Sequence, residues 1–318
     1  MKKIFIDGAE GTTGLKIFER FKDRHDIEIL KIDPELRKDE NERKKLINES
    51  DITFLCLPDA AAIEAVKLVE NPNTVIIDTS TAHRTAEGWA YGFAELDESF
   101  RKNIESSKRI ANPGCHASGF ISIAYPLVKS GIIKKDSRLC CFSLTGYSGG
   151  GKKMIAEYEG EDRLPELDSP RQYGLSQTHK HMKEMQKICG LEKAPMFSPI
   201  VDDYYSGMEV TVYIYPELLQ NPGDFKNISE GLYEFYKKYY NNCSLIKVRE
   251  PGYEQETRGF YGANTLSGYD YMEIMVNGNE ERAIVTARFD NLGKGASGAA
   301  IQNMNIVMGI EEVTGLVI

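Results

Sequence analysis

The sequence predicts an α/β protein of two domains: an N-terminal doubly wound parallel sheet, followed by an α+β domain whose sheet is mostly antiparallel. Three observations predict this fold. The chain has 318 residues, more than a single domain commonly holds. Its first part alternates short apolar runs with segments of helical periodicity. Beyond about residue 115 the apolar runs become longer and polar loops separate them.

The N-terminal domain is expected to alternate strands and helices. The strands are expected at KKIFID, IEILKI, DITFLCLP and TVIID, and the helices between them at residues 15–24, 42–49 and 60–70. Parallel strands need a long crossover connection, commonly a helix, so this alternation is typical of a doubly wound sheet.

The second domain is expected to carry longer strands. They are predicted at SRLCCFSLTGY, MEVTVYIYP and RAIVTARFD, together with a helix at GLYEFYKKYY. The closing residues 294–318 predict an amphipathic helix that packs back on the first domain. We therefore place the first domain at residues 1–114 and 294–318, and the second at residues 115–293.

The composition excludes several classes of function. The formal net charge is −9, and nucleic acids and membrane surfaces call for a basic patch, so we expect neither partner. No window reaches about 18 apolar residues, and the N-terminus lacks the features of a signal peptide, which predicts a cytoplasmic protein. The six cysteines include no CxxC pair, so we expect neither a disulfide framework nor a metal site.

A glycine-rich turn follows the first predicted strand and opens the first predicted helix. It places Gly8, Gly11 and Gly14 around Thr12 and Thr13. Glycines at such points allow a tight turn and a close approach of the backbone to a pyrophosphate, which then lies at the positive end of the helix. The spacing is GxxGxxG, and its position between strand and helix predicts a Rossmann-like dinucleotide site formed by these five residues.

The next predicted strand leaves the choice of dinucleotide open. Asp33 ends that strand, where an acidic residue often binds the ribose 2′-hydroxyl and selects NAD. Arg37 and Lys38 follow closely and are suited to a 2′-phosphate. These residues are compatible with either NADP or NAD.

Cys115 is the candidate nucleophile. It follows an Asn-Pro-Gly turn and begins the run HASGFISIAYPLV, which we expect to be an amphipathic helix. A helix N-terminus stabilises negative charge, so the pKa of this thiol should be lowered and its thiolate favoured. A thiolate at a nicotinamide site suits attack on an activated acyl group or an aldehyde, followed by hydride exchange.

The histidines that can serve this thiol are few. Of five in the chain, His179 and His181 form an H-x-H-x-x-E pattern with Glu184, in which the carboxylate can fix the tautomer of one imidazole. His116 adjoins Cys115, but we expect it to point elsewhere on the helix. Two histidines and one carboxylate are too few donors to indicate a metal site.

Five blocks of sequence together resemble a known family. They are GAEGTTG, ANPGCHASG, GYSGGGKK, HKHMKE and DNLGKGASGAAIQNMNIVMGIEE. The blocks extend from residue 8 to residue 312, nearly the whole chain. The chain is similar to the N-acetyl-gamma-glutamyl-phosphate reductases, and its short length and the segment GWAYGFAEL resemble the shorter of their two subgroups.

This resemblance implies an activity in arginine biosynthesis. NADPH would reductively dephosphorylate N-acetyl-L-glutamyl 5-phosphate to N-acetyl-L-glutamate 5-semialdehyde and phosphate. The family motifs place the nucleophile at Cys115 and the catalytic histidine at His179, with Glu184 as its partner. The resemblance also implies a homodimer or homotetramer and NADP as cofactor, with NAD not excluded.

An anionic acyl-phosphate substrate calls for cations and backbone N–H groups around it. Arg84 lies in the loop after the strand TVIID, at the carboxyl end of the sheet, where ligands bind. The glycine loop GYSGGG offers backbone N–H groups to an anion. We expect substrate contacts from Asn112, Arg84, Ser148 and His181, and further cofactor contacts from Ser80 and Gly149.

Other functions remain open at this point. Aspartate-semialdehyde dehydrogenase is similar in fold and also uses a cysteine with a nicotinamide. The lysine-pathway reductase takes an aminoadipyl substrate one methylene longer, a difference worth only about 1–3 kcal/mol in a pocket. A dinucleotide-sensing regulator should have lost the thiol or its histidine, and a cysteine hydrolase would leave the glycine turn without a use.

Overall fold

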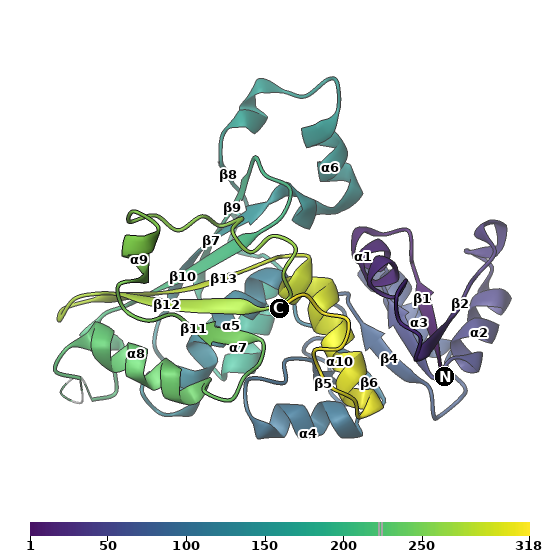
Figure 1. Cartoon of the computed structure of the whole chain (residues 1–318), viewed down its shortest axis with the longest axis horizontal. Coiled ribbons are helices and arrows are strands. Elements are labelled where there is room, and N and C mark those ends of the chain that lie inside the picture. The colour runs from purple at the N-terminus through teal and green to yellow at the C-terminus, as the bar shows by residue number, and fades with distance from the viewer. Residues whose placement is uncertain (222, 224) are drawn as a thin grey trace. The chain divides into compact units, whose positions relative to one another are not determined.

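The computed structural model describes residues 1–221, 223 and 225–318, and divides them into two compact units (Figure 1). Unit 1 comprises Met1–Gly114 and Ala296–Leu316, and unit 2 comprises Cys115–Gly295 and Val317–Ile318. Among the described residues, no helix has the length and apolar character needed to span a bilayer.

Unit 1 is built on a six-stranded sheet in which every pairing is parallel. In sheet order its strands are β2 (Ile27–Leu30), β1 (Lys2–Asp7), β3 (Ile52–Leu55), β4 (Val75–Asp78), β6 (Arg109–Ala111) and β5 (Ala90–Tyr91). The four predicted strands are confirmed, and the two short strands β5 and β6 were not predicted. Too few residues lie in either for an apolar run to be recognised.

Helices pack on both faces of this sheet. They are α1 (Thr12–Arg20), α2 (Glu40–Glu49), α3 (Asp59–Lys67), α4 (Glu98–Ser106) and α10 (Gly298–Met308). Successive side chains of a strand point to opposite faces. Accordingly, Ile4 and Ile6 of β1 join a core with residues of α1, α4 and α10, whereas Phe5 joins a second core with residues of α2 and α3. The predicted doubly wound sheet is therefore confirmed.

The expectation that α10 is amphipathic is wrong. Every residue from 298 to 306 is buried, including three with polar side chains. Those side chains are hydrogen-bonded: the Gln302 amide donates to Glu95 at 2.9 Å, and the Asn303 amide donates to the Gly92 carbonyl at 3.0 Å. The polar residues of α10 therefore form hydrogen bonds inside the protein and do not make up a face exposed to solvent.

Unit 2 contains a seven-stranded sheet that is mostly antiparallel. In sheet order its strands are β11 (Ile246–Val248), β12 (Met272–Gly278), β13 (Ala283–Phe289), β10 (Met208–Ile214), β7 (Cys140–Gly146), β9 (Met196–Asp202) and β8 (Arg171–Gln172). Only the pairings β11–β12 and β7–β9 are parallel. The predicted strands correspond to β7, β10 and β13, so the α+β character of this unit is confirmed.

The helices of unit 2 are α5 (Cys115–Lys129), α6 (Gly151–Glu159), α7 (His181–Cys189), α8 (Ile228–Tyr239) and α9 (Tyr253–Glu256). Helix α5 was expected to be amphipathic, and this is wrong because every residue from His116 to Val128 is buried. The helix packs against β10 and β13 on one side and α7 on another. Its approach to the sheet requires Gly119, since a Cβ there would lie 2.4 Å from Cγ2 of Val210.

Candidate active site

The glycine-rich turn of unit 1 has the geometry of a nucleotide cradle. Gly8 directly follows β1 with φ at +88°, and a Cβ there would lie 2.4 Å from the Cys56 carbonyl oxygen. A Cβ on Gly14 would lie 2.5 Å from the Gly8 carbonyl oxygen. Both positions therefore need glycine, and the absence of side chains lets a ligand approach the backbone.

Helix α1 begins directly after this turn. Gly11 is its N-cap, and the cap provides no side-chain hydrogen bond to the first backbone N–H groups. Thr12 and Thr13 form the first turn and are partly exposed. Uncapped N–H groups at a helix start favour an anion, which fits the pyrophosphate of a dinucleotide.

The acidic residue near β2 is used within its own loop. The strand ends at Leu30 and not at residue 32 as predicted, so Asp33 lies beyond it. Its carboxylate accepts a hydrogen bond of 2.9 Å from the Glu35 N–H and caps a short 3₁₀ turn. Arg37 forms a 2.6 Å ion pair with Glu10, which belongs to the glycine-rich turn. A cation therefore lies beside the candidate cradle.

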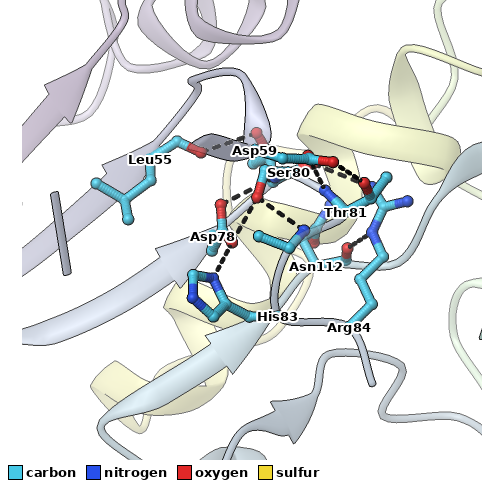
Figure 2. A network of polar contacts seen from close by, with 10 residues as sticks. Leu55, Asp59, Asp78, Ser80, Thr81, His83, Arg84 and Asn112 are labelled. Atoms are coloured by element: carbon cyan, nitrogen blue, oxygen red, sulfur yellow. Dashed lines mark hydrogen bonds and ion pairs between the residues drawn. The ribbon is translucent and has the colours of Figure 1, made fainter. Parts of the chain in front are cut away.

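The loop after β4 is folded around a buried carboxylate (Figure 2). Asp78 accepts hydrogen bonds from the Ser80 N–H at 2.9 Å and the Ser80 hydroxyl at 2.7 Å, and its other contact is His83 Nδ1 at 2.6 Å. The His83 ring stacks on Trp89 with 4.0 Å between ring centroids. Ser80, predicted to contact the cofactor, is thus fixed at the carboxyl end of the sheet.

Two further predicted residues brace the same loop. The Arg84 guanidinium donates to the carbonyl oxygens of Asn112 at 2.9 Å and Thr79 at 3.0 Å (Figure 2). The Asn112 side chain donates to the Ala296 carbonyl at 2.9 Å and accepts from the Asn303 amide at 3.1 Å. Arg84 and Asn112, predicted to bind substrate, therefore also fix the path of the chain in unit 1.

Cys115 is the first residue of α5, as the sequence predicts, and is partly buried. Gly295 lies close to it. A Cβ on Gly295 would lie 3.0 Å from Cβ of Cys115 and 3.1 Å from the Asp290 carbonyl oxygen. Any side chain at position 295 would therefore displace the thiol or the backbone next to it.

The histidines of unit 2 form a cluster. His179 precedes α7 and His181 begins it, with 4.8 Å between their ring centroids. The His116 ring lies 5.8 Å from that of His179 and 5.6 Å from that of His181. His116, expected to point elsewhere on the helix than Cys115, thus contacts both histidines of the H-x-H-x-x-E pattern, and its direction relative to the thiol stays a prediction.

Hydrogen bonding and burial define the states of these rings. The backbone N–H of His181 donates to Nδ1 of His179 at 3.3 Å, so a neutral His179 carries its proton on Nε2. Burial lowers the pKa of His179, and the charge of Lys180 lowers it further. Burial, together with the charge of His179, lowers the pKa of His116 to about 3. His116 is therefore neutral at physiological pH.

Glu184 lies on α7 and is buried. It is three residues after His181, so these two side chains share a face of the helix. His179 lies before the helix, and the hydrogen bond given to its ring comes from the His181 backbone. The role of Glu184 as the partner of His179 stays a prediction.

The glycine loop after β7 places the remaining candidates. Ser148 is buried, and its hydroxyl accepts a hydrogen bond of 3.0 Å from the Asn291 amide, whose oxygen accepts from the Gly207 N–H at 2.8 Å. Gly149 is exposed and lies in the 3₁₀ turn Tyr147–Gly150.

Among the residues that the structure describes, no group of three or more metal-ligating side chains is suitably placed for an ion.

Comparison with known proteins decides the family. Residues 3–105 match the family described as semialdehyde dehydrogenase, NAD binding domain, and residues 115–291 match semialdehyde dehydrogenase, dimerisation domain. The N-acetyl-gamma-glutamyl-phosphate reductase of Trichormus variabilis is 41% identical over 322 residues, or 99% of each chain. The reductase of the same name from Chelativorans sp. is 40% identical over 311 residues, covering 96% of this chain and 98% of its own.

The chain belongs to the N-acetyl-gamma-glutamyl-phosphate reductase family. This confirms the family predicted from the five sequence blocks, and with it an oxidoreductase that uses a nicotinamide dinucleotide. Solved structures show the shared fold. Aspartate-semialdehyde dehydrogenase from Francisella tularensis matches with a TM-score of 0.73 and 16% identity over 97% of this chain and 100% of its own. Aspartate-semialdehyde dehydrogenase II from Vibrio cholerae matches with a TM-score of 0.71 and 14% identity over 97% and 98%.

Several residues around the candidate nucleophile and the histidine cluster were not predicted from the sequence. His116 and Ser143 were identifiable in part, since one follows the candidate nucleophile and the other is a polar residue in an apolar strand. Tyr173 and Gly295 carry no comparable signal, because neither belongs to a periodic pattern that ties it to Cys115. Only the folded chain brings them to this region.

Proposed function

We propose that the protein catalyses the NADPH-dependent reductive dephosphorylation of N-acetyl-L-glutamyl 5-phosphate, giving N-acetyl-L-glutamate 5-semialdehyde and phosphate in arginine biosynthesis. The observation that carries the proposal is a cysteine at the first position of a buried helix, followed by a histidine that packs against two others. A glycine-rich turn suited to a dinucleotide precedes it in the same chain.

The first step is acyl transfer to Cys115. The thiolate attacks the carbonyl carbon of the acyl phosphate, a C–S bond forms, and the bond from that carbon to the phosphate oxygen breaks. Phosphate leaves and a thioester remains on the enzyme. The N-terminus of α5 favours the thiolate through the positive end of the helix dipole.

The second step reduces the thioester. When bound, the reduced dinucleotide supplies the hydride that converts the thioester to a thiohemiacetal. The Nε2–H of His179 then donates a hydrogen bond to the oxyanion of this thiohemiacetal, because its Nδ1 accepts from the His181 N–H. As the thiohemiacetal collapses, the C–S bond breaks, the aldehyde leaves and Cys115 becomes a thiolate again.

Substrate and cofactor contacts are assigned on charge and position. Arg84, Asn112, Ser148 and His181 are proposed to bind the anionic substrate, and Glu184 to support the histidines from α7. The cofactor is assigned to Gly8, Gly11, Thr12, Thr13, Gly14, Ser80 and Gly149.

NADPH is proposed as the cofactor. Asp33, the residue that would select NAD, uses its carboxylate to cap its own turn. Arg37 lies beside the glycine-rich turn through its ion pair with Glu10 and is suited to a 2′-phosphate. Comparing kcat/KM for NADPH and NADH tests this assignment, which fails if NADH is the better substrate.

We also propose a homodimer or a homotetramer formed through the sheet of unit 2. Apolar side chains are exposed on adjacent strands β13, β10, β7 and β9, where Ile284 pairs with Tyr213 and Cys140 pairs with Met196. Such a row across a sheet favours association. Sedimentation of wild type and Tyr213→Glu should show the wild type as the larger species.

A cytoplasmic location is proposed on the state of the cysteines. All six are free thiols, which suits a reducing compartment. Fractionation of the source cells with an antibody to the protein tests this location.

The reverse reaction tests the proposed function. N-acetylglutamate semialdehyde, phosphate and NADP⁺ should give phosphate-dependent formation of reduced cofactor. Aspartate semialdehyde and the N-acetyl-aminoadipate analogue serve as comparison substrates. A higher kcat/KM for either analogue would overturn the substrate assignment.

A further inference from the structure

The loop that follows β7 is fastened to the loop that precedes β10. The Ser148 N–H donates to the Tyr205 carbonyl at 3.0 Å, and the Tyr147 N–H donates to the Tyr204 carbonyl at 2.9 Å. A Cβ on Gly146 would lie 2.6 Å from the Tyr204 carbonyl oxygen, so only glycine allows the two loops to approach this closely. The backbone that carries Ser148 is therefore held in place.

Asn291 joins these two loops through its side-chain amide. It is 2% exposed, its Oδ1 accepts from the Gly207 N–H at 2.8 Å, and its Nδ2 donates to Ser148 Oγ at 3.0 Å. A backbone N–H can only donate, so the atom that faces Gly207 must be the amide oxygen. The NH₂ group then faces Ser148, and the hydrogen bonds leave the amide one orientation.

This orientation decides what the Ser148 hydroxyl does with its proton. An amide NH₂ group donates and does not accept, so Ser148 Oγ accepts from Asn291 and keeps its own proton. Within the part of the chain that the structure describes, the Asn291 amide is the one hydrogen-bond partner of this hydroxyl. Ser148 is 1% exposed, and a buried donor is costly to leave without an acceptor. A ligand oxygen can supply that acceptor.

The residues directly after Ser148 leave room for such a ligand. Gly149 and Gly150 are exposed and have no side chains to cover the hydroxyl. Helix α6 then begins at Gly151 with no side-chain cap and no acidic residue in its first turn, which instead includes Lys152. A hydroxyl proton, uncapped N–H groups and a cation all favour an anionic oxygen.

We propose that Asn291 is a positioning residue for substrate binding: it directs the proton of the Ser148 hydroxyl away from itself, so that Ser148 donates to an anionic oxygen of the substrate. This inference rests on the proposed function, in which Ser148 binds the anionic substrate. Phosphate and the carboxylate of N-acetylglutamate semialdehyde share this chemistry, and the reverse reaction offers them as separate reactants.

Removal of the donor is the first test. Ser148→Ala takes away the hydroxyl and keeps the backbone of the loop. Loss of a hydrogen bond to a charged group should raise the KM for phosphate or for the semialdehyde roughly tenfold to a hundredfold, with little change in kcat. The reactant whose KM rises identifies the anionic group that Ser148 binds. Wild-type KM values for both, or a rise for NADP⁺ alone, would overturn the inference.

Asn291→Asp is the second test, because it reverses the direction of the hydroxyl. At about pH 8.5 the introduced carboxyl is ionised. It still accepts from the Gly207 N–H but also accepts the Ser148 proton, so the substrate loses its donor. The same KM should rise about as much as in Ser148→Ala, and the double variant should show no further rise. If the two factors multiply, the carboxylate acts by its charge and not through Ser148, and the inference fails.

Asn227→Asp is the matched control. Asn227 caps α8 by accepting from the N–H groups of Ser229 and Glu230, and a carboxylate caps a helix as well as an amide does. This variant should keep the wild-type KM values and kcat. If Asn291→Asp, shown to be folded by its melting temperature, also keeps them, the inference fails while wild-type turnover leaves the proposed function intact. An inactive wild type would instead refute the function.

Neutron diffraction from crystals of the wild type tests the same point without any variant, because it locates hydrogen as deuterium. We expect a deuteron of Asn291 Nδ2 on the line to Ser148 Oγ, and the Ser148 deuteron directed away from Asn291. A Ser148 deuteron on the line to Asn291 would overturn the proposal.

Discussion

The loop after β4 in unit 1 and the histidine cluster of unit 2 both collect polar side chains in protected surroundings, but they use them differently. In the loop, the side chains of Asp78 and Arg84 bind mainly backbone or adjacent groups and fix the path of the chain. In the cluster, His116 binds the side chains of Ser143 and Tyr173. The first arrangement fixes a loop at the carboxyl end of the sheet, whereas the second joins side chains that can exchange hydrogen-bonding protons.

The two regions therefore predict different consequences of substitution. A change in the cluster should alter chemical rates while leaving ligand affinity and folding nearly intact. A change in the loop should alter affinity and stability while leaving the reactivity of the thiol intact.

The largest effect short of removing the nucleophile is expected from His179→Asn. Loss of the Nε2–H donor to the oxyanion should lower kcat by roughly a hundredfold to a thousandfold, measured by cofactor absorbance under saturation. His25→Asn is the control, because His25 is exposed. Equal activity in both variants would show that the reaction does not use this donor.

Gly295→Ala should have the next largest effect. The added methyl would lie 3.0 Å from Cβ of Cys115, so the thiol must move, and a small misplacement of a nucleophile can cost roughly a hundredfold in rate. NADPH affinity, measured by fluorescence titration, should not change. Gly223→Ala, where nothing lies within 4 Å of the added Cβ, should remain fully active. A fully active Gly295→Ala would show that this contact is not critical.

Asp78→Asn tests the loop. The amide keeps only one acceptor oxygen, so its NH₂ group must face either the Ser80 N–H or the oxygen position shared by the Ser80 hydroxyl and His83. The free energy of unfolding should therefore fall by about 2 kcal/mol and NADPH affinity by roughly tenfold. Urea unfolding measures the free energy of unfolding, and titration with NADPH measures the affinity. The rate at which iodoacetamide alkylates Cys115 should stay at its wild-type value. The exposed Asp23→Asn is the control. Altered thiol reactivity with unaltered NADPH affinity would reverse the roles of the two regions.

The smallest effect concerns pH. The pKa of His116 is lowered from 6.5 to about 3 in the folded protein, so below pH 6.5 the unfolded chain binds a proton that the folded one excludes. Its stability contribution is complete above pH 6.5 and is lost progressively as pH falls toward 3. Between pH 6.5 and 5, wild type should lose roughly 2 kcal/mol more than His116→Gln in urea unfolding. Equal losses would mean that His116 is accessible to protons when folded.

The same contrast explains what the sequence could predict. The strands β1, β2, β3 and β4 of unit 1 lie in apolar runs, and the glycines of the first turn are required by local backbone geometry, so both were predictable. The character of α5 and α10 was not, because a helix buried on all sides can carry residues such as Ser122 and Asn303 that bond internally. Periodicity assigns such residues to solvent.

The residues of the candidate site also differ in how far the sequence could predict them. Cys115 and His179 lie in motifs whose chemistry depends on adjacent residues, so the sequence could offer them as candidates. The contact between His116 and Tyr173 joins residues 57 positions apart in the chain. No local pattern encodes that contact.

The most direct measurement is mass spectrometry of the acyl-enzyme. Wild type and Cys115→Ser would be mixed with N-acetyl-L-glutamyl 5-phosphate without reduced cofactor, then examined intact and as peptides, with released phosphate measured in parallel. We expect one N-acetylglutamyl group on the Cys115 peptide of wild type, matched by released phosphate, and none at that position in the variant. Turnover by wild type with no adduct on Cys115, or a Cys115→Ser variant that keeps its activity, would contradict this expectation.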